Sequence, residues 1–242
     1  VEHVAILLTD LGRNAEGIEL QRSLLDGIEQ EPECERSDVH VNLAWMLLRA
    51  GGSGAAARTH ADRALTVLAE TRCPDPFRIK NAHLTAALSA LDSADGARAR
   101  SELTLARPLA RESAELGLWQ LDLEARLELG AGRVEQAEQL YERGAEMAQR
   151  FGARDALWRA RTGQASALAR RGARKAAIER LVEAESVLDR SLLAAPVAEG
   201  RDTFLTARDT SAQRLVRLLL DSGDLQGAFD AARRARARGL PS

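Results

Sequence analysis

Four histidines are the side chains of this sequence that most readily bind metal ions or carry out acid–base chemistry. His3, His40, His60 and His83 show no His-x3-His or comparable ligand spacing. The stretch "GGSGAAA" at 51–57 could be taken for a phosphate-binding loop, but no strand pattern precedes it and no Lys-Ser/Thr follows it. A Gly-x-Ser-x-Gly nucleophile elbow does not occur either. We therefore expect no catalytic residues, no metal and no cofactor.

The two cysteines are the remaining candidates for covalent chemistry. Cys34 stands near Pro32 and Cys73 stands beside Pro74, so both are expected next to turns between helices. A Cys/His nucleophilic pair is possible on paper, which leaves a hydrolase fragment open as one alternative. Two cysteines cannot form a disulfide framework, so we expect reduced thiols in a cytoplasmic protein.

Charge and hydropathy narrow the classes of partner. The formal net charge is −2, which gives no whole-chain attraction for nucleic acid or an anionic membrane. The basic run Arg233, Arg234, Arg236 and Arg238 is interpreted as a solvated helix end rather than a nucleic-acid site. No apolar run approaches the roughly 18–20 residues that span a bilayer. The chain begins without Met and without a secretory signal, which predicts a segment of a longer cytoplasmic protein.

The sequence repeats with a period of 40 residues. Turn-forming residues recur at this interval, and a small residue follows each of them by five positions. The turn residues are Gly12, Gly52, Asp92, Gly132 and Gly172, and the small residues are Gly17, Ala57, Ala97, Ala137 and Ala177. Apolar residues on both sides of each turn recur at helical spacing. The pattern predicts an all-α protein built from antiparallel helix pairs.

The register divides the chain into about six such pairs. Five units in step are expected at 1–32, 33–74, 75–115, 116–153 and 154–190. A sixth pair, 205–242, turns at Gly223 rather than at the expected position 212, so about eleven residues are inserted. We place the inserted loop or hinge at 191–204. Pro108 falls inside the second helix of the third unit and should kink or split that helix.

At these residues the chain resembles the tetratricopeptide repeat (TPR) family. In "LELGAGRVEQAEQLYERGAEMA", 127–148, Gly132 matches the turn glycine of that family, and Ala137, Tyr141 and Gly144 match its small–aromatic–small series. Ala125 matches the small residue where the two helices cross. The resemblance implies an α-solenoid with a right-handed superhelix, although the usual TPR period is shorter than this one.

A second resemblance lies at the C-terminal end. The stretch "LLLDSGDLQGAFDAARRARARGL" looks like the helical pair that precedes a caspase-like CHAT protease domain in many bacterial proteins. This resemblance implies that the chain is the regulatory segment of such a protein.

The TPR resemblance also implies a concave groove lined by the first helix of each unit. Arginine can pair with peptide carboxylates there, and amides can hold an extended backbone. Unit by unit, the residues placed on this surface are Asn42, Met46, Arg49, Asp122, Arg126, Arg159, Ser166, Arg170, Gln213 and Arg217. A solvated polar face is the alternative interpretation of the same residues.

The functional hypothesis is a regulatory solenoid that binds a protein or peptide and controls a linked effector such as a CHAT protease. A structural spacer or oligomerisation scaffold is one alternative. The TPR sensor region of a bacterial transcriptional or signalling regulator is another. The sequence leaves the identity of the partner and the oligomeric state open.

Overall fold

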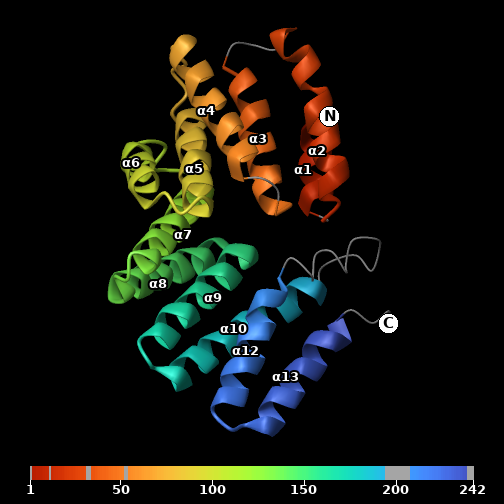
Figure 1. The fold of residues 1–242 in the computed structure, drawn as a ribbon, viewed down its shortest axis with the longest axis vertical. Coiled ribbons are helices and arrows are strands. Elements are labelled where there is room, and N and C mark those ends of the chain that lie inside the picture. The colour runs from red at the N-terminus through yellow and green to blue at the C-terminus, as the bar shows by residue number, and fades with distance from the viewer. Residues whose placement is uncertain (1, 11, 31–33, 52–53, 194–207, 239–242) are drawn as a thin grey trace. The chain divides into compact units, whose positions relative to one another are not determined.

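The computed structural model describes residues 1–242 except 1, 11, 31–33, 52–53, 194–207 and 239–242. The described residues form helices and turns, without a strand (Figure 1). The helices are α1 (Glu2–Asp10), α2 (Asn14–Ser23), the 3₁₀-helix η1 (Leu25–Gln30), α3 (Arg36–Arg49), α4 (Gly54–Glu70), α5 (Pro76–Asp92), α6 (Gly96–Ala106), α7 (Ala114–Gly130), α8 (Val134–Phe151), α9 (Arg154–Arg170), α10 (Arg174–Leu193), α12 (Asp209–Asp221) and α13 (Leu225–Arg238).

The chain divides into two compact units, Val1–Leu127 and Glu128–Ser242. In the first unit, α1 packs on α2, α3 on α4 and α5 on α6, and each pair also contacts the next. In the second unit, α8 packs on α9, α9 on α10 and α12 on α13, while α10 also contacts α12. Each unit is therefore a stack of antiparallel helix pairs in which neighbours in sequence are neighbours in space.

Left-handed backbone conformations mark the turns between the two helices of each pair. Residues with positive φ at these turns are Gly12, Gly51, Ala94, Gly132, Gly172 and Gly223. Glycine adopts this conformation without the steric cost that a Cβ brings. The turn glycines at 12, 132, 172 and 223 are those predicted from the sequence, while Gly52 lies outside the described residues.

The prediction that Asp92 forms the third turn is wrong. Helix α5 continues to Asp92, and the positive φ falls on Ala94. The side chain of Asp95 accepts a hydrogen bond from the backbone N–H of Arg98 and so caps the start of α6. The small residue that faces the core is consequently Ala99, which is fully buried, whereas Ala97 is exposed.

Pro108 ends a helix, as its position predicted. Helix α6 stops at Ala106, so it is shorter than its counterparts. The following turn is held by Lys80, which is buried and donates from Nζ to the backbone carbonyl of Leu109 at 3.0 Å. Burial lowers the pKa of Lys80. A turn thus replaces the last part of this second helix.

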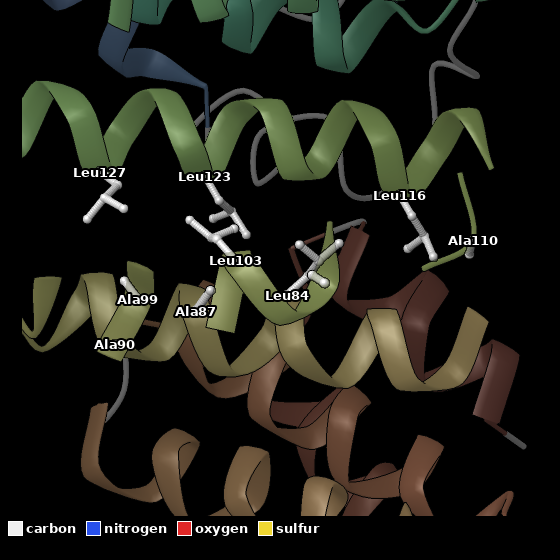
Figure 2. Packing of buried hydrophobic residues seen from close by; sticks show 10 residues of the cluster. Leu84, Ala87, Ala90, Ala99, Leu103, Ala110, Leu116, Leu123 and Leu127 are labelled. Carbon is white, nitrogen blue, oxygen red and sulfur yellow. The ribbon is translucent and has the colours of Figure 1, made fainter. Parts of the chain in front are cut away.

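Small and medium apolar residues fill the spaces between the helices. Figure 2 shows one such cluster in the first unit, where Leu84 and Ala87 of α5 meet Leu103 of α6 and Leu123 of α7. Leu103 and Leu123 point toward one another, and both are almost completely buried. Alanine at the neighbouring contact positions lets the helix axes approach closely, which explains the low aromatic content of 3%.

The expectation of reduced thiols is wrong for this structure. Cys34 and Cys73 form a disulfide, with Cα atoms 5.5 Å apart and a sequence separation of 39 residues. A separation of about one repeat period places the two cysteines in successive connections between helix pairs, where the stacking brings them together. Disulfides persist in oxidising compartments, so the cysteines no longer support a cytoplasmic location.

The predicted insertion at 191–204 lies outside the described residues apart from the end of α10 at Leu193. The described residues continue from Arg208, which stands immediately before α12. Among the described helices none is long and apolar enough to cross a membrane.

Candidate functional site

The outer face of α9 carries three of the residues that the sequence placed on a groove. Arg159, Ser166 and Arg170 lie within about 40° of one another around the helix, because successive residues are 100° apart. Arg159 forms an ion pair with Asp155 one turn earlier, at 3.1 Å. The guanidinium of Arg170 donates to the backbone carbonyl of Leu129 at the end of α7.

The adjoining face of α12 continues this surface. Gln213 and Arg217 are exposed and share it with Leu220, an apolar side chain with half of its area exposed. Two contacts join the helices. The guanidinium of Arg214 donates to the hydroxyl of Ser166, and Arg208 pairs with Asp155 of α9 at 2.7 Å.

We call this surface the α9/α12 face. It is formed by the residues Arg159, Ser166, Arg170, Gln213, Arg217 and Leu220. Four arginines (Arg159, Arg170, Arg214 and Arg217) lie on it or at its edge, against Asp155 and Asp209. The surface is therefore positively charged, with an exposed apolar side chain among the arginines.

The predicted groove residues of α3 lie in the other unit and make intramolecular contacts. The side-chain amide of Asn42 donates to the carboxylate of Glu2 on α1. The guanidinium of Arg49 stacks over the ring of Trp45 with its Cζ 4.8 Å from the ring centroid. The placement of Met46 on the groove surface is wrong, because this side chain is fully buried in the cluster between α1, α2 and α3.

Asp122 and Arg126 are one turn apart on the same side of α7, in the first unit. Arg126 is exposed and Asp122 is partly buried. Helix α5 packs against both α3 and α7. The structure thus brings together the α9 and α12 residues, whereas the α3 and α7 residues lie on helices separated by α5.

A hollow that the sequence did not predict lies on the opposite side of α9, against α8. It has a volume of about 360 Å³ and is lined by Glu135, Glu138, Gln139, Glu142, Gln164 and Arg171. Glu135, Glu138 and Glu142 repeat at helical spacing along one face of α8. The spacing of these glutamates could have indicated the hollow from the sequence. The TPR resemblance, however, implies a groove lined by the first helix of each unit, and α8 is a second helix.

A buried arginine lies beside this hollow. Arg161 of α9 pairs with Glu142 of α8 at 2.9 Å and with Glu183 of α10 at 3.0 Å. Gln164 accepts a hydrogen bond from the same guanidinium at 2.9 Å. Arg171 neutralises Glu138 at 3.1 Å. Much of the acidic lining is therefore neutralised by the chain itself.

A second polar cluster lies in the interior of the second unit and fixes α12 and α13. The indole N–H of Trp158 donates to the Ser211 hydroxyl at 2.9 Å, and this hydroxyl donates to the Glu185 carboxylate at 2.6 Å. Arg238 pairs with the same carboxylate and with Asp189 at 2.7 Å. The prediction of a wholly solvated basic run is therefore wrong for Arg238, which is buried.

Two histidines of the first unit form a pair. The Nδ1 atoms of His40 on α3 and His60 on α4 are 3.1 Å apart, which requires one nitrogen to donate and the other to accept. Burial, together with the charges of His60 and Arg63, lowers the pKa of His40 to about 4, and burial lowers the pKa of His60 as well. Within the described part of the chain, no group of three or more His, Cys, Asp or Glu side chains could hold a metal ion.

Comparison with solved structures relates these helix pairs to known repeat proteins. The chain is similar to the Rap protein complexed with Competence and Sporulation Factor, with a TM-score of 0.70 and 12% identity over 97% of this chain and 72% of that one. It is similar to BtubC (BKLC) from P. vanneervenii, with a TM-score of 0.67 and 15% identity over 96% of this chain and 90% of that one. The fold is a TPR-like α-solenoid. The fold class predicted from the sequence is therefore confirmed.

A third similar structure is a STAND protein (Signal Transduction ATPase with Numerous Domains) with a tetratricopeptide repeat sensor, from Pyrococcus horikoshii. Its TM-score is 0.58 at 15% identity, over 98% of this chain and 37% of that one. At such identities the likeness establishes the fold alone. No protein-family model and no curated protein sequence matches this chain.

Proposed function

We propose that this chain is a protein-interaction repeat module that binds an acidic, partly apolar peptide segment on the α9/α12 face. The observation that carries the proposal is the meeting of exposed arginines and an exposed leucine on two adjacent first helices. The structural neighbours are TPR-type binding and sensor repeats, and one of them was solved with a bound factor, which supports the same class of function.

The chemistry of the face suits such a segment. Arg170 and Arg217 present planar guanidinium groups, which bind carboxylates through two parallel hydrogen bonds. Gln213 supplies both a donor and an acceptor for an extended peptide backbone. Leu220 offers an apolar surface for one side chain of the segment. Carboxylates give orientation and the apolar contact adds affinity.

The proposal includes a regulatory role for the bound state. A solenoid whose pairs contact only their neighbours can pass a change at one seam to a linked domain. We propose that the effector is a linked catalytic domain such as a CHAT protease, as the resemblance of the last helical pair implies. The TPR sensor of the STAND protein provides an example of such a repeat in a signalling protein.

Selection from a random peptide library displayed on phage tests the binding role. We expect enriched peptides to combine Asp or Glu with an apolar residue. Replacing Arg159, Arg170 and Arg217 together by Glu should weaken the binding of an enriched peptide by about tenfold or more, which corresponds to about 1.4 kcal/mol.

A matched control variant has the same net charge, because it also replaces three arginines by glutamate, but at positions away from the α9/α12 face. Arg143, Arg190 and Arg234 are exposed in the same unit and lie off the α9/α12 face. Their replacement by Glu should leave the affinity within about twofold of the unmodified chain. Equal losses in both triple variants, or a library that yields no enriched peptide, would count against the proposal.

A further inference from the structure

Two imidazole rings of the first unit face each other across a helix pair. The Nδ1 atoms of His40 on α3 and His60 on α4 are 3.1 Å apart, while the centroids of the two rings are 5.4 Å apart. The two nitrogens therefore lie between the rings, and each points at the other. Because this pair joins two helices, its members show none of the short ligand spacings by which metal sites are recognised in a sequence.

Both imidazoles can act as metal ligands through these nitrogens at neutral pH. A histidine ligand must be neutral, with a free lone pair on the nitrogen that binds. Burial is the main cause that lowers the pKa of His40 to about 4, and burial lowers the pKa of His60 as well. Each neutral ring can carry its proton on Nε2, which leaves both Nδ1 lone pairs directed into the space between the rings.

The geometry of the pair limits which ion can bind. Two nitrogens that point at one another offer two ligands in a line. Among the residues that the structure describes, no group of three or more His, Cys, Asp or Glu side chains is placed to hold a metal ion. Zn²⁺ in proteins is bound tetrahedrally by four ligands, and Cu²⁺ prefers a square-planar set. Cu⁺ and Ag⁺ have filled d shells and accept two nitrogen ligands in a line.

The charges near the pair favour an ion of low charge. Arg63 lies on α4 one turn after His60 and acts on His40, and Arg22 lies on α2 and acts on His60, both as positive charges. Their Coulomb repulsion is half as large for a monovalent ion as for a divalent one. An ion pair between Arg63 and Glu70, at 3.6 Å, reduces this repulsion further.

We propose that His40 and His60 form a two-coordinate site for Cu⁺ between α3 and α4. An ion about 2 Å from each nitrogen places the two nitrogens about 4 Å apart, which is wider than the 3.1 Å of the hydrogen-bonded pair. Both side chains are partly exposed, so small rotations of the rings can provide this separation. The bound ion takes the place of the hydrogen bond and links the two helices of one pair.

Calorimetric titration of the whole chain with Ag⁺ in chloride-free buffer tests the site, because Ag⁺ shares the preference for two ligands and is stable in air. Cys34 and Cys73 are joined in a disulfide, so neither offers a competing thiol. One equivalent of Ag⁺ should bind. His40→Asn and His60→Asn should each weaken this binding by about tenfold or more, since even the loss of an outer partner of a metal ligand costs about 10–100-fold.

Two control variants remove other side chains that could bind Ag⁺. His3→Asn removes an exposed imidazole on α1, and Met147→Leu removes a partly exposed thioether on α8. Both should keep the affinity within about twofold of the unmodified chain, because neither residue contacts the pair. Nitrogen NMR spectra of the imidazole rings give a readout that needs no variant. One equivalent of Ag⁺ should shift both Nδ1 signals of the pair in the unmodified chain.

Competition identifies the kind of ion that the site prefers. Cu⁺, kept reduced by ascorbate, should displace the bound Ag⁺, whereas Zn²⁺ should not. Absence of a bound equivalent in the unmodified chain overturns the proposal. A loss of affinity in His3→Asn or Met147→Leu as large as that in His40→Asn also overturns it, because that result assigns the ion to another site. Displacement of Ag⁺ by Zn²⁺ but not by Cu⁺ overturns it as well.

Discussion

Replacing Glu185 by Ala should destabilise the second unit by about 3 kcal/mol. Glu185 is 2% exposed and accepts hydrogen bonds from the Ser211 hydroxyl at 2.6 Å and from the guanidinium of Arg238. Removing one partner of a buried ion pair typically costs about 3–5 kcal/mol. We expect a cost at the lower end of this range, because the partly exposed carboxylate of Asp189 remains 2.7 Å from Arg238 and still pairs with its charge.

Chemical denaturation followed by circular dichroism, together with thermal melting, measures this loss. For a chain of this size, about 3 kcal/mol corresponds to a fall in melting temperature of roughly 6–12 °C. Limited trypsin digestion gives a second readout, since loss of the anchor at Arg238 should expose α13 to cleavage at Arg233 and Arg234.

Two further variants make the test specific. Glu179→Ala removes an exposed carboxylate from the same helix and should change the stability by less than about 0.5 kcal/mol. Replacing Glu185 by Leu and Arg238 by Met together leaves no unpaired charge in the interior, because Asp189 is partly exposed to solvent, and should recover most of the loss. Equal effects of Glu185→Ala and Glu179→Ala would refute the reasoning.

Three further predictions each concern one contact between neighbouring helices or connections. Gly163→Ala should lower the free energy of unfolding by about 1–3 kcal/mol in denaturant, because the new Cβ on α9 would overlap the ring of Tyr141 on α8. An unchanged midpoint would contradict this packing of α8 against α9. The pKa of His40 is lowered to about 4 in the folded state, so the folded chain binds a proton at His40 less readily than the unfolded chain does. The neutral side chain therefore contributes stability above pH 6.5, and this stability should be lost as the pH falls toward 4. Melting temperatures measured across that range should fall more steeply for the unmodified chain than for His40→Phe, and parallel curves would contradict the effect. Cys34 and Cys73 should give no reactive thiol in the unfolded, unreduced chain, and two titratable thiols would contradict the disulfide. Reduction should lower the free energy of unfolding by about 4 kcal/mol, because the disulfide closes a loop of 39 residues.

The sequence predicted the fold because the repeat depends on local chemistry. Turn glycines at 12, 132, 172 and 223 adopt the left-handed conformation that was inferred from their spacing. Alanines five positions later, such as Ala137 and Ala177, are fully buried as the register required. These features depend on neighbours in the chain, so one sequence is sufficient to identify them.

The third turn shows where periodicity alone fails. Asp92 fits the 40-residue count, yet Asp95 caps α6 through its side chain and moves the turn to Ala94. The capping hydrogen bond at the start of α6 thus determines where the turn lies, and the 40-residue period does not. Met46 was misplaced for a similar reason, because helical spacing alone does not say which neighbouring helix covers a side chain.

Buried charges were the least predictable part of the candidate site. Arginine is the usual polar residue of this chain, so Arg238 was expected to be solvated with its neighbours, and Arg161 was not singled out at all. Each is buried because carboxylates arrive from other helices, Glu142 and Glu183 for Arg161 and Glu185 for Arg238. The disulfide was missed in the same way, since it joins successive repeats. Such long-range pairs exist only once the helices have stacked.

Backbone hydrogen exchange in the presence of the strongest peptide from the library is the most direct test of the proposed function. The account predicts that the peptide slows exchange in α9 and α12, and that the Arg159, Arg170 and Arg217 triple variant shows no such slowing. Protection confined to α8, beside the carboxylates Glu135 and Glu138, would contradict the account and assign binding to the hollow instead. Protection that persists unchanged in the triple variant would contradict it as well.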